Sequence, residues 1–167
     1  MKEKILNEVT LMIYNSNVKN AIKLMFEKHK DQVDKAGYPY VFHPFHVAEQ
    51  MKDEDTTIAA LLHDVVEDTD TTFDDLREYG VSEKIIEALK LLTHNSNVDY
   101  YEYVRRISNN PIARKVKIKD LEHNMDLSRL DKIEASDLER LYKYKSCYEF
   151  LTSIDKEYDE KCLEEMK

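Results

Sequence analysis

Residues 61–72 read LLHDVVEDTDTT, a stretch that combines the apolar residues of a buried helix with a dense group of ionisable side chains. Five ionisable residues fall within eight positions: His63, Asp64, Glu67, Asp68 and Asp70. Burying a charge without a partner costs roughly several kcal/mol or more, so proteins rarely do it without compensation. We therefore expect this stretch to bind a ligand.

The ionisable residues follow a helical spacing. On a helix, residues four positions apart lie on one face, about 6 Å from each other. If one helix runs through the stretch, His63 lies one turn before Glu67, and Asp64 lies one turn before Asp68. Imidazole nitrogen and carboxylate oxygen are suitable ligands for Mn, Fe or Zn. His63 and Asp64 are therefore candidate metal ligands, and the alternative is a solvated acidic helix face.

Two ligands do not make a tight metal site, so further ligands must come from elsewhere in the chain. His43 precedes Pro44 at the expected start of a helix, where its ring can point away from the core. Asp120 and Asn124 interrupt an otherwise apolar helix stripe, and a carboxylate on a core-facing stripe is an informative exception. The apolar members of that stripe are Ala113, Val116 and Leu127. We expect a mixed nitrogen and oxygen shell formed by His43, His63, Asp64 and Asp120.

Other charged residues have simpler interpretations. Asp120 could instead form a buried salt bridge with Lys35 or Arg114. Alternate residues on a helix point in different directions, so a run of three lysines is expected to be mostly solvated: Lys115, Lys117 and Lys119. The remaining histidines are expected outside the metal shell, in structural or surface positions: His29, His46, His94 and His123.

The chain has few residues that break helices. Only two glycines and three prolines occur in 167 residues, and no stretch alternates with the period of a strand. We expect one all-α domain over residues 1–167, a bundle of about eight to ten helices. Helices with both ends expected cover about residues 2–15, 18–34 and 100–108. Further helices are expected to start at Pro44, at a cap in residues 53–55, at the Thr72/Asp75 capping box, at Ser82 and at Asn110-Pro111. One or two final helices start at a Ser136/Glu139 capping box and end at about Glu164.

Charge and hydropathy exclude several classes of partner. The formal net charge of −9 argues against nucleic-acid binding, which needs a basic surface. No apolar run approaches the roughly 20 residues of a membrane helix, and residues 1–15 do not resemble a signal peptide. We expect a cytoplasmic protein with a small-molecule partner, and its oligomeric state stays open.

Three segments together resemble a known family. HPFHVA at 43–48, LLHDVVEDTDTT at 61–72 and VKIKDLEHNMD at 116–126 are similar to the HD-domain hydrolase half of the RelA/SpoT alarmone enzymes. DKAGYPY at 34–40 resembles the R-K-S-G-x-P-Y of that family. The likeness covers about residues 29–130, and the length is similar to that of the stand-alone small alarmone hydrolases.

The resemblance implies roles for ten residues. One divalent ion, Mn²⁺ in the family, would be held by His43, His63, Asp64 and Asp120. Glu67 and Asp68 match the catalytic acidic pair. The substrate would be a nucleotide, and the reaction would remove the 3′-diphosphate of (p)ppGpp as pyrophosphate, giving GDP or GTP. Residues that match substrate-binding positions are Lys35, Asn124, Arg140 and Tyr144.

The sequence also departs from the family pattern. Asp34 replaces an arginine that packs on the guanine base, and Leu121 and Glu122 replace an arginine and a leucine after the metal-binding aspartate. A carboxylate cannot stack on a base as a guanidinium can. The alternatives are therefore hydrolysis of another nucleotide or of a dinucleotide phosphate, and a non-catalytic module that senses a nucleotide.

Overall fold

The computed structural model describes residues 13–165, with side chains to residue 156, and this part of the chain is all-α as predicted. It contains no strand, only an isolated bridge between Val33 and Pro39. The helix expected over residues 2–15 lies outside the described residues, except for positions 13–15, which are not helical. No described helix is long and apolar enough to cross a membrane. The elements are α2 (Ser16–His29), α3 (Phe42–Glu49), α4 (Glu54–Leu62), α5 (Val65–Asp68), α6 (Phe73–Glu78), α7 (Glu83–Leu92), α8 (Tyr100–Ile107), α9 (Pro111–Met125), the 3-10 turn η1 (Leu127–Arg129) and α10 (Ala135–Glu165).

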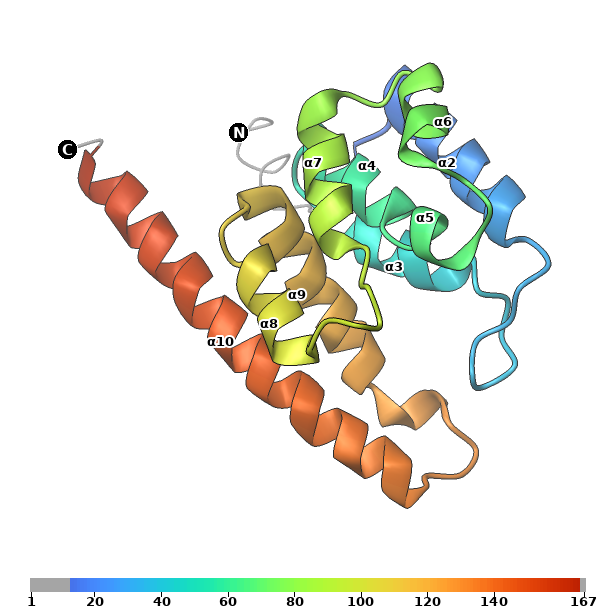
Figure 1. Ribbon diagram of the computed structural model, residues 1–167, viewed down its shortest axis with the longest axis vertical. Coiled ribbons are helices and arrows are strands. Elements are labelled where there is room, and N and C mark those ends of the chain that lie inside the picture. Colours follow the sequence, from blue (N-terminus) through green and yellow to red (C-terminus); the bar gives the residue numbers. More distant parts are fainter. Residues whose placement is uncertain (1–12, 166–167) are drawn as a thin grey trace, which may run out of the picture.

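Helix α4 forms the centre of the fold. It contacts α2, α3, α7 and α9, and all its residues from Thr56 to Leu62 are buried. A helix enclosed on all sides needs apolar residues around its whole circumference, which explains the run TTIAALL. Helix α10 runs along α8 and α9 on the outer side of the bundle (Figure 1). The end of α4 and the inner face of α9 therefore meet inside the molecule.

Most of the predicted helix starts are confirmed. The Asp53 side chain accepts a hydrogen bond from the backbone of Thr56 at 2.9 Å, and Asn110 does the same for Ala113 at 3.0 Å. The capping box of Thr72 with Asp75 is complete in both directions. Each cap satisfies a backbone N–H that the first helical turn leaves without a partner.

The predicted Ser136/Glu139 box is wrong. Helix α10 starts at Ala135, so Ser136 already lies inside it. The Asp137 carboxylate takes the capping role, because its Oδ2 accepts the backbone N–H of Glu134 at 2.9 Å. The helix is also continuous to Glu165, whereas the sequence left open one helix or two.

The opening stretch is not one helix. Helix α4 ends at Leu62, His63 and Asp64 form a turn, and α5 begins at Val65. His63 Nδ1 lies 2.7 Å from the carbonyl oxygen of Ala60, which a continued helix would use for the N–H of Asp64. The His63 side chain thus competes with the backbone of Asp64 for this acceptor. The prediction that His63 and Glu67 lie one turn apart on a single helix is wrong, because Glu67 belongs to α5 and His63 precedes it in the turn.

Candidate metal centre and substrate pocket

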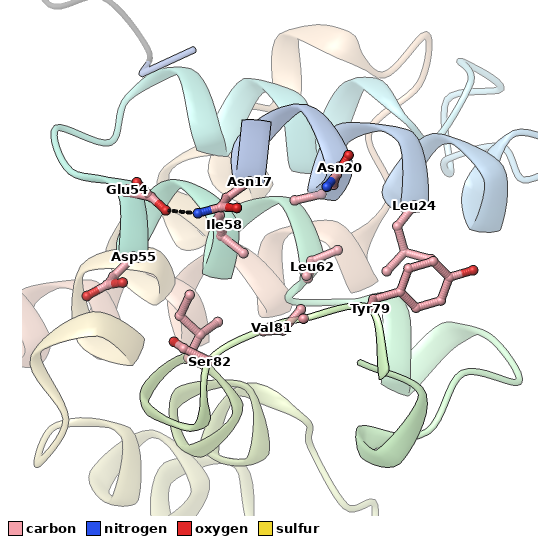
Figure 2. A pocket seen from close by; sticks show the side chains of 13 residues that line it. Asn17, Asn20, Leu24, Glu54, Asp55, Ile58, Leu62, Tyr79, Val81 and Ser82 are labelled. Carbon is pink, nitrogen blue, oxygen red and sulfur yellow. Dashed lines mark hydrogen bonds between the residues drawn. The ribbon is translucent and has the colours of Figure 1, made fainter. Parts of the chain in front are cut away.

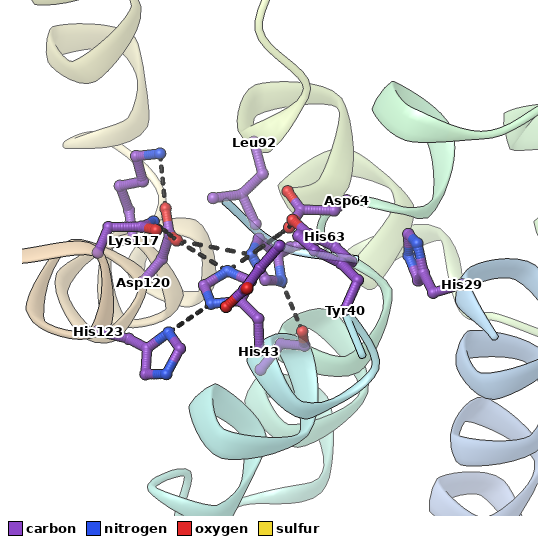
Figure 3. Close-up of polar contacts among 12 residues, drawn as sticks. His29, Tyr40, His43, His63, Asp64, Leu92, Lys117, Asp120 and His123 are labelled. Atoms are coloured by element: carbon purple, nitrogen blue, oxygen red, sulfur yellow. Dashed lines mark hydrogen bonds and ion pairs between the residues drawn. The ribbon is translucent and has the colours of Figure 1, made fainter. Parts of the chain in front are cut away.

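Four side chains from three parts of the chain converge at the end of α4 (Figure 3). His43 comes from α3, Asp120 from α9, and His63 and Asp64 from the turn between α4 and α5. Asp120 Oδ1 lies 3.2 Å from His43 Nε2 and 3.8 Å from His63 Nε2. Asp64 Oδ2 lies 3.1 Å from His63 Nε2 and 3.6 Å from His43 Nε2. The four residues predicted as metal ligands are therefore neighbours.

The orientation of His63 fits a bound cation. Its Nδ1 donates to the carbonyl of Ala60, so Nε2 is the ring nitrogen left to face the cluster. That Nε2 is buried without a hydrogen-bond partner, and it faces the carboxylates of Asp64 and Asp120. Buried polar atoms without a partner are uncommon. Although burial opposes a charge on His63, the carboxylates of Asp64 and Asp120 raise its pKa well above the usual value, so this position favours a positive charge, on the ring or on a bound cation. The donor set of two imidazoles and two carboxylates suits a divalent transition metal.

His123 orients the second imidazole. His43 Nδ1 and His123 Nδ1 are 2.7 Å apart, and the two ring centroids are 4.8 Å apart. Burial, helped by His43 and Arg129, lowers the pKa of His123 to about 4, so its ring is neutral and can accept the proton that His43 Nδ1 donates. This leaves His43 Nε2 directed at the carboxylates. A hydrogen bond to the distal nitrogen is how proteins usually fix a metal-binding histidine. His123 was predicted to lie outside the metal shell. It contacts the ring nitrogen of His43 that faces away from the carboxylates.

Lys117 is the main residue that sequence reasoning missed. Its ammonium group donates to Asp120 Oδ2 at 2.7 Å, while Asn124 donates to Asp120 Oδ1 at 2.5 Å. The side chain is 11% exposed and lies over the rings of Tyr100 and Tyr103, so the expectation that it is solvated was wrong. Positions 117, 120 and 124 follow the i, i+3, i+7 spacing of one helix face, which is the signal that could have found it.

Lys117 also settles the alternative for Asp120. The salt bridge is with Lys117, whereas Lys35 and Arg114 pair with Asp137 and Asp155. Burial opposes ionisation of Asp120, but Lys117 and the two imidazoles outweigh it and hold the pKa of this carboxyl well below its usual value. Asp120 is therefore a carboxylate, as a metal ligand must be.

The acidic pair lies beside this cluster. Glu67 Oε2 accepts the backbone N–H of His94 at 2.7 Å, which fixes the direction of its carboxyl group. Partial burial and the negative charge of Asp64 raise the pKa values of both Glu67 and Asp68 above their usual range. A carboxylate with a raised pKa is a better proton acceptor, which suits a general base.

These groups line a first compartment of about 390 Å³, which adjoins a second compartment of about 260 Å³. The two share Tyr40, His43, Asn124 and Tyr144 as wall residues. The metal cluster and the acidic pair line the first compartment, whereas Lys35 and Arg140 line the second. The structure thus brings all ten residues of the predicted site to the walls of two adjoining cavities, and their chemical roles stay predictions.

The second compartment differs from expectation in its charges. Lys35 and Arg140 both bind the carboxylate of Asp137, a contact that the sequence did not reveal. Asp34, which departs from the family pattern, forms an ion pair of 2.8 Å with Arg129 and accepts the backbone N–H groups of Ala36 and Tyr38. A guanidinium group is therefore present in this compartment, on the segment after α9.

A separate pocket lies between α2, α4 and the turn around Gly80 (Figure 2). Its volume is about 130 Å³, a third of that of the metal-side cavity. It is lined by two acidic residues. Glu54 accepts hydrogen bonds from the side chains of Asn15 and Asn17 at 2.6 and 2.7 Å, and Asp55 is paired with Lys84 at 2.7 Å. We assign no ligand to it.

Comparison with known proteins identifies the family of the chain. The model of the HD domain matches residues 21–119, which is more than half of the chain and includes three of the four clustered residues. The chain belongs to the HD-domain family. The matched segment ends at Lys119, one residue before Asp120.

Several curated relatives of this HD domain are named as alarmone enzymes. The guanosine-3′,5′-bis(diphosphate) 3′-pyrophosphohydrolase of Aquifex aeolicus is 37% identical over 87 residues, which are 50% of this chain and 12% of that protein. The enzyme MESH1 of Danio rerio with the same function name is 48% identical over 58 residues, 30% of this chain and 32% of that protein. The bifunctional (p)ppGpp synthase/hydrolase SpoT of Escherichia coli is 43% identical over 56 residues, 31% of this chain and 8% of that protein. The matches therefore span a third or less of the length of these relatives.

A solved structure supports the same fold. The HD domain superposes on a structure described as a metazoan ortholog of SpoT that hydrolyzes ppGpp, with a TM-score of 0.67 and 22% sequence identity. The superposition covers 89% of this chain and 94% of the other. At this identity the likeness establishes the helical arrangement.

Proposed function

We propose that this HD-domain protein is a metal-dependent phosphohydrolase that removes the 3′-diphosphate of (p)ppGpp. The convergence of two histidines and two aspartates beside the Glu67–Asp68 pair carries this proposal. The names of the relatives supply the substrate. Water adds to the phosphorus next to the 3′ oxygen, and the bond from that phosphorus to the 3′ oxygen breaks. Pyrophosphate leaves, the 3′ oxygen takes up a proton, and the nucleoside product is GDP or GTP.

One divalent ion would be held by His43, His63, Asp64 and Asp120. When bound, such an ion lowers the pKa of water to about 7 and offsets charge on the phosphoryl oxygens. Manganese as this ion stays a prediction from the family resemblance, and a cytoplasmic location stays a prediction from the hydropathy of the sequence. Tyr40 donates to Asp64 Oδ2 at 2.5 Å, which holds that carboxylate in place toward the imidazoles.

The chain's own residues supply the proton transfer and hold the substrate. Glu67 takes the proton of the attacking water, and its fixed contact with the N–H of His94 keeps the carboxyl directed. Lys117 and Lys143 lie on the wall of the first compartment and offset the charge of the departing diphosphate. In the second compartment the rest of the nucleotide is held by Lys35, Asn124, Arg140 and Tyr144.

A second candidate substrate follows from the charges around the second compartment. In the resembled family an arginine stands at the position of Asp34. Here the guanidinium group belongs to Arg129, which follows α9 and forms an ion pair with Asp34. A base could be bound there in another way, so hydrolysis of another nucleotide or of a dinucleotide phosphate is the alternative. Both candidates use the same metal cluster and the same acidic pair.

A substrate panel decides between the two candidates. With Mn²⁺ present, we expect kcat/KM for ppGpp to exceed that for the adenosine analogue with the same phosphates, and that for a nicotinamide dinucleotide phosphate, by about tenfold or more. The measurement is release of pyrophosphate or phosphate under initial-rate conditions. A preference for a compound without guanine would favour the second candidate. Tight binding without turnover would instead indicate a nucleotide-sensing module.

A further inference from the structure

Asp137 forms ion pairs with two cationic residues of the second compartment. Its side chain is 3% exposed, and its Oδ1 binds both Lys35 and Arg140, the latter at 3.2 Å. Its Oδ2 accepts the backbone N–H of Glu134 at the start of α10, which fixes the position of the carboxylate. A buried carboxylate thus stands between the two cations that are proposed to hold the nucleotide.

The remaining charges of this compartment are balanced as well. Its cations are Lys35, Arg129 and Arg140, and its carboxylates are Asp34, Asp126 and Asp137. Arg129 is paired with Asp34, and Asp126 accepts hydrogen bonds from Ser128. An anion that enters this compartment therefore meets cations that already have carboxylate partners, so it must displace or share those partners.

We propose that Asp137 is a specificity-determining residue, which competes with the phosphates at the 5′ position of the substrate for Lys35 and Arg140. This inference rests on the proposed function, because the 3′-diphosphate must lie at the metal cluster for the 5′ phosphates to reach the adjoining compartment. The carboxylate repels each additional negative charge at the 5′ position. It thereby weakens the binding of nucleotides with more 5′ phosphates, because Lys35 and Arg140 stay partly paired with Asp137.

The substitution Asp137→Asn tests this role with little structural change. An asparagine oxygen can still accept the N–H of Glu134, while the negative charge between the two cations is removed. We expect KM for ppGpp to fall by about tenfold and kcat to stay within about twofold of the parent value, because Asp137 does not line the compartment of the metal cluster. Thermal unfolding of both proteins checks that the fold is kept.

The dependence on substrate charge separates this role from a general effect. The ratio of kcat/KM between Asp137→Asn and the parent should rise as the 5′ group is changed from monophosphate to diphosphate to triphosphate. Glu139→Gln is the matched control, since Glu139 is exposed on the same helix and lies outside both compartments. It removes the same charge, and it should leave KM unchanged for all three substrates.

The outcomes separate this inference from the proposed function. An unchanged or higher KM in Asp137→Asn, or an equal change in Glu139→Gln, would overturn the role of Asp137 while ppGpp hydrolysis stands. If neither the parent nor Asp137→Asn releases pyrophosphate, the proposed function fails. The affinity of the two proteins for GDP, measured by calorimetry, then tests whether Asp137 opposes binding of 5′ phosphates. Tighter binding of GDP by Asp137→Asn supports the inference. Equal binding, or no binding by either protein, counts against it.

Discussion

Asp64→Asn is expected to lower the turnover of ppGpp by about 10³-fold and to remove most of the bound metal. Asp64 Oδ2 lies within 3.6 Å of the Nε2 atoms of both His43 and His63, so its charge is central to the cluster. Asparagine keeps the shape of the side chain, but it supplies a weaker, neutral oxygen ligand. Turnover with Mn²⁺ and the metal content of the dialysed protein are the two measurements.

Asp70→Asn is the control for this experiment. Asp70 lies in the same stretch of sequence, but its side chain is 88% exposed and pairs with Lys28 on the surface. It should retain the parent's turnover and metal content. If Asp64→Asn binds metal as the parent does and turns over at the same rate, the cluster is not the metal centre of this protein.

Glu67→Gln is expected to reduce kcat by about 10²- to 10⁴-fold while the metal stays bound, because a glutamine cannot accept the proton of the attacking water. The glutamine oxygen can still accept the backbone N–H of His94, so the local structure should be kept. The measurement is kcat for ppGpp together with metal content, which distinguishes a lost proton acceptor from a lost ligand.

Glu78→Gln removes an exposed carboxylate at the end of α6 and should have no effect on either quantity. A parallel loss of metal in Glu67→Gln would place Glu67 in the metal shell. Full activity of Glu67→Gln would exclude it as the proton acceptor and would move that role to its neighbour Asp68.

Apart from the residues that the family resemblance supplied, the features that the sequence predicted were those that follow from local spacing. Asp120 could be recognised because a carboxylate on an apolar helix stripe must face something other than solvent, and it lies at the cluster. The helix caps at Asp53 and Asn110 likewise depend on contacts only three residues apart. Local geometry alone decides such features.

Contacts between distant segments were predicted only where the family resemblance pointed to them, as for His43, His63, Asp64 and Asp120, and the other contacts of this kind were missed. The break after Leu62 accompanies a local contact of His63 Nδ1 with the Ala60 carbonyl, while Nε2 of the same ring lies 3.8 Å from Asp120 on a distant segment. Asp137 and Lys35 are 102 residues apart in the chain, and no pattern in the sequence indicates that they meet. Lys117 was missed for another reason, since a run of lysines resembles a solvated face until its partner is known.

Metal-dependent removal of the 3′-diphosphate is tested most simply by the effect of Mn²⁺ on the reaction with ppGpp. The purified protein is stripped with a chelator, incubated with ppGpp, and then given Mn²⁺ while pyrophosphate and GDP are quantified. If the metal cluster catalyses the reaction, no products form before Mn²⁺ is added, and equal amounts of pyrophosphate and GDP form afterwards. Equal rates with and without the metal, or release of phosphate in place of pyrophosphate, would contradict this role of the cluster.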